Sequence, residues 1–145
     1  MLEVLLINVL VVVLSVLVHY EFLYQATELL PRLKIRHRAR IVAVVFIALL
    51  AHVIEIWIYA YAYFRMHNSE DWGSLQGNFD GSLLDSVYFS FTTFSTLGFG
   101  DIEPLGDIRF LVGMEALAGF VLITWSASFL FFEMQRYWNA KQLAD

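Results

Sequence analysis

The sequence predicts an all-α membrane protein with three transmembrane helices and a shorter re-entrant helix between the second and the third. The chain of 145 residues is 59% hydrophobic and only 16% charged, with a mean hydropathy of +0.65, which is too apolar for an ordinary soluble domain. Three segments are long enough to cross the hydrocarbon core, which takes roughly 20 helical residues. A fourth segment is amphipathic but too short to cross.

The composition also narrows the function. A net charge of −5 argues against a nucleic-acid partner, because a phosphate-binding surface needs clustered Lys and Arg. The chain has no Cys, which excludes disulfides and thiolate metal sites. We expect a single domain that is not an enzyme and that has no cofactor.

The first predicted helix begins with an apolar run from Met1 to Tyr20 that is interrupted only by Glu3, Asn8, Ser15 and His19. A cleaved signal peptide is the alternative, but it requires a basic start and a small-x-small cleavage site, and the run has neither. From residue 21 the pattern becomes amphipathic, and Pro31 is expected to end or kink the helix. We therefore expect residues 1–30 to form an extra N-terminal transmembrane and amphipathic helix, peripheral to the rest.

Residues 31–40 form a basic loop, with five of the chain's nine Lys and Arg residues between Arg32 and Arg40. The positive-inside rule places this loop in the cytoplasm. A voltage-sensor helix also carries arginines, but here the charges recur at every second residue without apolar pairs between them. The loop is therefore interpreted as an anchor that sets the topology and attracts anionic lipid headgroups.

The second predicted span covers residues 41–64, and its aromatic end, from Trp57 to Phe64, marks the outer interface. His52 and Glu55 lie three residues apart and thus on one face of this helix. Ionisable groups at membrane depth are costly and face protein, each other or water. They are interpreted either as a proton-sensitive pair or, preferably, as a hydrogen-bonded pair that joins helices. The H-x-x-E spacing also suggests a metal site, but weakly, since no third ligand is evident.

Residues 65–81 are polar and predict an external loop, whose acidic residues either concentrate cations or are simply solvated. The segment 82–94 then predicts a short helix, with Ser82 as its N-cap and Asp85 in its first turn. A helix of this length can only enter the membrane and return. Irregular backbone after it is permitted at that depth only where it is lined by protein or water.

Residues 95–101 follow this helix and contain Thr96-Leu97-Gly98-Phe99-Gly100-Asp101. Glycine adopts positive φ readily, so successive carbonyls of such a strand can face the same way and replace the water shell of a potassium ion. The motif resembles the T-V-G-Y-G-D selectivity filter of the potassium channel superfamily, in its bacterial two-transmembrane pore type, with Leu97 and Phe99 in place of Val and Tyr. A chance glycine turn is the alternative. The resemblance covers residues 41–132 and leaves the first helix outside.

The resemblance implies the tetrameric potassium-channel pore fold, with K⁺ as the permeant ion and a homotetramer as the assembly, because one chain supplies only one filter loop. It implies that Asp101 lies buried behind the filter and hydrogen-bonds to the pore helix. It assigns the K⁺ sites to the carbonyls of Thr96, Leu97, Gly98 and Phe99. Gly100 is expected to open the outer mouth, and the residues expected to support the filter are Asp101, Thr92 and Glu115. Leu97 and Phe99 change the packing of the filter, and whether this makes the filter less selective is left open, because several potassium channel families carry Phe at this position.

The third predicted span covers residues 107–132. Gly119 is interpreted either as a gating hinge or as a close-packing position. The stripe Val121, Thr124, Ser128 and Phe132 is expected to line the cavity and inner pore, with Phe132 as a constriction that gates by dewetting. The alternative is that its hydroxyls bond backbone within the helix. Glu115 is expected either to brace the pore helix or to sense protons.

Residues 133–145 predict a short cytoplasmic tail, which gives a multi-pass topology in the cell membrane, expected to be a bacterial inner membrane, with the N-terminus outside. No nucleotide-binding or calcium-binding motif follows the third span, so gating is expected through the filter, the inner helices, lipid, protons or a possible separate regulatory subunit. The predicted function is passive conduction of potassium. The alternatives are a weakly selective monovalent cation channel, a non-conducting membrane subunit or scaffold and, remotely, an intramembrane enzyme that uses His52 and Glu55.

Overall fold

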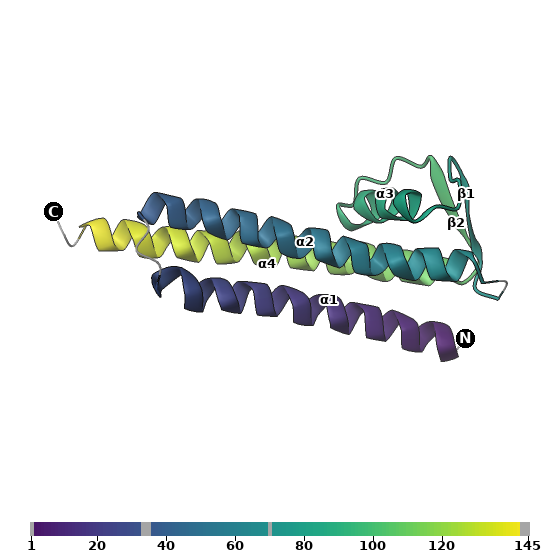
Figure 1. Cartoon of the computed structure of the whole chain (residues 1–145), viewed down its shortest axis with the longest axis horizontal. Helices are drawn as coiled ribbons and strands as arrows, with labels where there is room; N and C mark the ends of the chain where they lie inside the picture. Colours follow the sequence, from purple (N-terminus) through teal and green to yellow (C-terminus); the bar gives the residue numbers. More distant parts are fainter. Residues whose placement is uncertain (1, 33–35, 70, 143–145) are drawn as a thin grey trace.

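A computed structural model describes residues 2–32, 36–69 and 71–142. Its three long helices, α1 (Leu2–Leu29), α2 (His37–His67) and α4 (Ile108–Gln142), lie side by side (Figure 1). Each is long and apolar enough to cross a membrane. The N-terminal end of α1 lies at the same end of the bundle as the two short strands, whereas the C-terminal end of α1 and the start of α2 lie at the other end (Figure 1). The predicted all-α membrane fold with three candidate spans is therefore confirmed.

Helix α1 packs through one face onto α2 and α4. The buried positions recur at helical spacing and are Val4, Asn8, Val11, Ser15, His19, Leu23 and Ala26. Three of the four polar residues that interrupt the apolar run thus point at other helices rather than at lipid. The helix continues without a break through residue 21 to Leu29, and Pro31 lies in the single 3-10 turn η1 (Leu30–Arg32) that follows.

Helices α2 and α4 run further than the hydrophobic pattern predicts, and α2 does so at both ends: it continues to His67, so residues 65–67 of the predicted external loop are helical. Helix α2 begins at His37, so Arg38 and Arg40 are helical and only part of the basic segment 31–40 is loop; residues 33–35 lie outside the described residues. Helix α4 continues to Gln142, so most of the predicted tail 133–145 is helical. No Gly or Pro occurs in these extensions, and helices end most readily at those residues.

The predicted external loop 65–81 contains a strand, which the sequence analysis did not foresee. Strand β1 (Ser74–Gly77) pairs antiparallel with β2 (Ile102–Leu105), with Gly77 opposite Ile102. The N–H of Asn78 donates to the Asp101 carbonyl at 2.8 Å. This small sheet therefore fixes the chain at the point where the motif segment 95–101 ends.

Helix α3 (Leu83–Phe94) lies beside α2 and α4 at the end of the bundle that carries the strands (Figure 1). The predicted N-cap is confirmed, because the Ser82 side chain accepts a hydrogen bond from the Asp85 N–H at 3.1 Å. Just before it, hydrogen bonds from the side chain and the N–H of Ser82 lower the pKa of the exposed Asp80 carboxyl below its ordinary value. The start of α3 is thus fixed by local polar contacts.

Candidate functional site

The segment 95–101 leaves the end of α3 and is held there by the helix backbone. The N–H of Thr96 donates to the Thr93 carbonyl at 2.9 Å, and the N–H of Gly98 donates to the Thr92 carbonyl at 3.1 Å. The Thr92 side chain is buried and donates to the Phe89 carbonyl at 2.9 Å. The predicted support residue Thr92 therefore contacts the segment through its main chain rather than through its hydroxyl.

Positive φ angles recur at every second residue of this segment. The φ angle is +58° at Thr96, +53° at Gly98 and +76° at Gly100, whereas Leu97 and Phe99 have no positive φ. Alternation between left-handed and right-handed residues turns successive N–H groups toward one side, and hence the carbonyls toward the other. A β-branched residue in the left-handed region costs about 1–2 kcal/mol, so the contacts around Thr96 must offset that cost.

The side chains of the same segment project outward from the single chain. Leu97 is 62% exposed and Phe99 is 65% exposed, so nothing in the described part of one chain covers these two large apolar groups. Asp101 is half-buried in the single chain, and its burial behind the filter stays a prediction for the assembled protein. It does bond to α3, because the Tyr88 hydroxyl donates to Asp101 Oδ2 at 2.9 Å. A phenolic hydroxyl thus braces this segment from α3, although Phe99 itself has none.

Glu115 of α4 lies at the centre of a buried hydroxyl network. Its carboxylate is fully buried and is contacted by the hydroxyls of Tyr63 on α2 and Ser90 on α3. The Ser90 hydroxyl also lies 2.9 Å from the Ile56 carbonyl of α2. Glu115 thus joins α3 to both long helices through hydroxyl groups, the contacts that a bracing role requires.

Gly119 of α4 lies directly against the last residue of α3. A Cβ added there would lie 2.2 Å from the carbonyl oxygen of Phe94 and 3.0 Å from its Cα. Under about 3.0 Å such a contact forces the backbone to move. The absence of a side chain at Gly119 is therefore required for the packing of α3 on α4, which supports the second of the two interpretations, whereas a hinge at this position stays a prediction.

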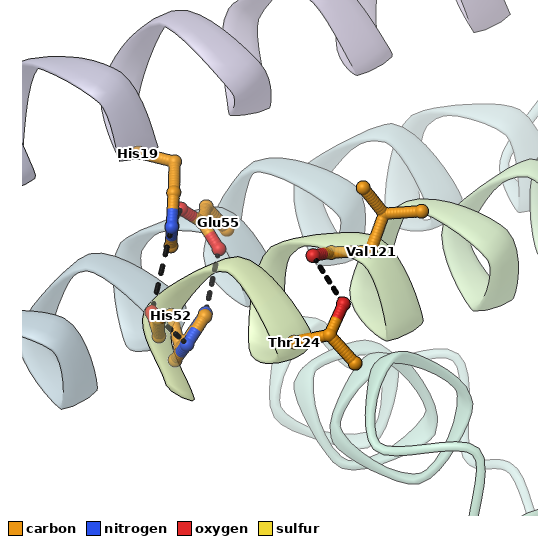
Figure 2. A network of polar contacts seen from close by, with 6 residues as sticks. His19, His52, Glu55, Val121 and Thr124 are labelled. Atoms are coloured by element: carbon orange, nitrogen blue, oxygen red, sulfur yellow. Dashed lines mark hydrogen bonds and ion pairs between the residues drawn. The ribbon is translucent and has the colours of Figure 1, made fainter. Parts of the chain in front are cut away.

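The predicted pore-lining stripe of α4 lies on the exposed side of the single chain. Its four members are exposed: Val121, Thr124, Ser128 and Phe132. The Thr124 hydroxyl lies 2.9 Å from the carbonyl of Val121 (Figure 2) and 2.9 Å from the carbonyl of Phe120. The Ser128 hydroxyl donates to the Thr124 carbonyl at 3.0 Å. These hydroxyls bond the backbone of their own helix, as the alternative interpretation holds.

The predicted pair His52 and Glu55 is part of a larger buried cluster. His52 Nδ1 lies 3.0 Å from Glu55 Oε2, and His19 of α1 places its Nδ1 2.9 Å from Glu55 Oε1 (Figure 2). On α4, the Ser126 Oγ lies 3.1 Å from His52 Nε2 and 3.4 Å from His19 Nε2. The statement that no third metal ligand is evident is therefore wrong: His19 supplies one, and the ligand atoms of the three residues lie within 4.8 Å of one another.

The sequence analysis missed the partners of these clusters because they come from distant segments. His19 lies 36 residues from Glu55, and Ser126 lies 107 residues from His19. One signal was available in the first helix: its polar interruptions at Asn8, Ser15 and His19 share one helical face. Polar residues on one face of an otherwise apolar helix indicate contacts with protein, and the structure places all three on the buried face.

Comparison with known proteins gives one match. A family model described as an ion channel matches residues 41–136, which run from the start of α2 through α3 and the 95–101 segment into α4. Helix α1 lies outside the matched stretch. No curated protein and no solved structure matches the chain.

Proposed function

We propose that four copies of the chain form a pore that conducts potassium ions passively. The chain belongs to the ion channel family whose model it matches, and this membership is the basis of the proposal. In this proposal the segment 95–101 is the selectivity filter. The carbonyl oxygens of Thr96, Leu97, Gly98 and Phe99 replace the hydration shell of the ion, and Gly100 opens the outer mouth. No chemistry on a substrate is involved, and K⁺ is the cargo.

The observation that carries the proposal is the alternating backbone of this segment. Positive φ at Thr96, Gly98 and Gly100 is the arrangement that gives consecutive carbonyls a common side, whereas an ordinary strand would alternate them. A merely structural turn needs one or two such residues, not three at every second position. The strain at Thr96 fits a segment shaped for binding, since such strain gathers at functional sites.

The tetramer follows from what one chain lacks. An ion in a filter needs oxygens on all sides, and one chain supplies one row of carbonyls, so identical rows related by a rotation axis must complete the site. The exposed side chains of Leu97 and Phe99 then find apolar neighbours in adjacent copies. The exposed stripe from Val121 to Phe132 on α4 faces the axis or the next copy, with Phe132 as the candidate inner constriction.

The orientation in the membrane follows from charge. The basic segment between Arg32 and Arg40 lies at the cytoplasmic side by the positive-inside rule. This places the N-terminus of α1, both strands and the outer end of the filter outside, and the end of α4 inside. An outward-facing filter mouth agrees with the charge rule, although the two arguments are independent.

Potassium efflux from potassium-loaded liposomes, together with native mass spectrometry of the purified protein, tests the proposal. We expect a tetramer that carries K⁺ above the leak of empty vesicles. The variant Gly98→Ala should abolish the flux but keep the tetramer, because no atom lies within 4 Å of the added Cβ in one chain and the conformation at φ +53° is the only part disturbed. A wild-type tetramer without flux would instead establish a non-conducting scaffold, and a monomer would refute the pore.

The second candidate function is a weakly selective monovalent cation channel, which differs from the first only in its selectivity for K⁺ over Na⁺. Leu97 and Phe99 differ from the Val and Tyr of the filter that this segment resembles, and both are exposed in the single chain, so their packing depends on neighbouring copies. We expect a clear preference for K⁺ over Na⁺ in reversal-potential measurements. Equal permeability in the wild type that becomes selective in a variant carrying Leu97→Val and Phe99→Tyr would favour the weakly selective alternative.

A further inference from the structure

The cluster of His19, His52 and Glu55 has the donor set of a transition-metal site. Imidazole nitrogens with a carboxylate suit Zn²⁺ and its neighbours, whereas Ca²⁺ and Mg²⁺ take oxygen ligands. The side chains of His19 and Glu55 are fully buried, and the His52 side chain is 13% exposed, so His52 is the least buried of the three. The cluster lies in the middle of α2 and joins it to α1.

Two distances within the cluster are within about 0.5 Å of the spacing of a tetrahedral site. Metal–ligand bonds of 2.0–2.2 Å imply ligand atoms about 3.4 Å apart. The two Nδ1 atoms lie 2.9 Å and 3.0 Å from the Glu55 oxygens, and the chosen ligand atoms of all three residues lie within 4.8 Å of one another. To reach that spacing, the two nitrogen–oxygen pairs open by about 0.4–0.5 Å, and a pair at the 4.8 Å limit closes by about 1.4 Å.

The hydroxyl of Ser126 lies near the Nε2 atoms of both His19 and His52 and has only one proton to donate. When both Nδ1–H groups donate to Glu55, both Nε2 atoms are acceptors, yet the one hydroxyl proton of Ser126 can satisfy only one of them. When a metal occupies the Nδ1 side, both Nε2 atoms carry protons, and the two lone pairs of the Ser126 Oγ accept from both. The partner on the far side of each imidazole is what metal-binding His residues require. Without a metal, the cluster needs an extra proton to close the same contacts.

We propose that His19, His52 and Glu55 bind one Zn²⁺-class ion per chain, with Ser126 as the outer hydrogen-bond partner, and that the ion fastens α1 to the matched channel region. The buried carboxylate of Glu115 has different partners, because hydroxyls rather than imidazoles contact it. The His52 ring also packs 5.6 Å from the ring of Phe94 at the end of α3. The bound ion thus lies one side chain away from the base of the 95–101 segment.

Metal content per chain, measured after purification with Zn²⁺ and removal of weakly bound ions, tests this site. We expect one ion per chain in the wild type and in Glu115→Gln, which is the matched control for loss of a buried carboxylate, and none in His19→Asn or Glu55→Gln. Ser126→Ala should bind 10-fold to 100-fold more weakly. Mg²⁺ and Ca²⁺ should not compete with Zn²⁺.

Two outcomes would overturn the proposal, and a second measurement keeps it testable where a variant fails to fold. The first is wild-type protein without retained Zn²⁺, and the second is equal retention in His19→Asn and the wild type. Co²⁺ added to the wild-type tetramer gives the independent readout: a tetrahedral site with imidazole ligands absorbs strongly in the visible range, whereas octahedral Co²⁺ absorbs weakly. A weak spectrum would assign the cluster to hydrogen bonding alone.

Discussion

Replacement of Gly119 by Ala tests how the end of α3 is held on α4. The added Cβ would lie 2.2 Å from the Phe94 carbonyl oxygen and 2.9 Å from its carbonyl carbon, and neither atom belongs to a flexible side chain. An ordinary contact is about 3.5 Å, so the two backbones must separate by roughly 1.3 Å. Overpacking of this kind costs about 1–3 kcal/mol, and part of this is offset by the gain of about 1 kcal/mol that Ala brings to a helix.

Gly113→Ala is the matched control, because it lies on the same helix and its added Cβ would meet no atom within 4 Å. Thermal unfolding of the purified protein should show Gly113→Ala unchanged or up to about 1 kcal/mol more stable, and Gly119→Ala less stable than this control by about 1–3 kcal/mol. Potassium flux should fall in Gly119→Ala alone, since Phe94 lies two residues before Thr96. Equal stability of the two variants would refute the packing argument and leave the hinge as the better explanation of Gly119.

Three further variants test single contacts. Ser82→Ala removes the N-cap of α3 and should lower thermal stability by about 1 kcal/mol; a variant as stable as the wild type would show that the cap contributes nothing. Tyr88→Phe removes the hydroxyl that donates to Asp101, and since the bond is exposed we expect a stability change of no more than about 1 kcal/mol but faster decay of potassium current during sustained conduction; unchanged decay would argue against a brace. Ser90→Ala leaves the buried carboxylate of Glu115 with one hydroxyl partner fewer and should destabilise the protein by about 1–3 kcal/mol, measured by chemical unfolding, whereas a neutral effect would show that the network is dispensable.

The features that local sequence determines were predictable. The long apolar runs fix the three candidate spans because burial in lipid needs only length and hydropathy, and Ser82 was identifiable as a cap because a cap bonds within three residues. The two strands were missed, since Ser74–Gly77 and Ile102–Leu105 are four residues each and gain stability only by pairing across α3. Helix ends were misjudged where charged residues that form helices well continue past the apolar run, as at Arg136, which pairs with Glu133 at 3.0 Å.

Of the polar contacts in the site, those within one helix were predictable from the sequence, whereas those between helices were not. His52 and Glu55 were recognised because a spacing of three residues places them on one face, but the approach of His19 depends on which face of α1 packs against α2. Gly119 shows the same limit: its small size allows either bending or close contact, and only the position of Phe94 distinguishes the two. Spacing identifies which residues can act together on one helix, and the packing of distant helices decides which partners they meet.

Phe94 packs between residues that are far apart in the sequence, Gly119 of α4 and His52 of α2. Its backbone lies against Gly119 of α4, its ring packs 5.6 Å from His52 and 6.4 Å from Tyr59 on α2, and its side chain is almost fully buried. His52 in turn shares the Glu55 carboxylate with His19 of α1. A packed chain of contacts therefore runs from α1 to the residue just before the strained 95–101 segment. Helix α1 is therefore connected to that segment by side-chain contacts through Glu55, His52 and Phe94, although it lies outside the matched family stretch.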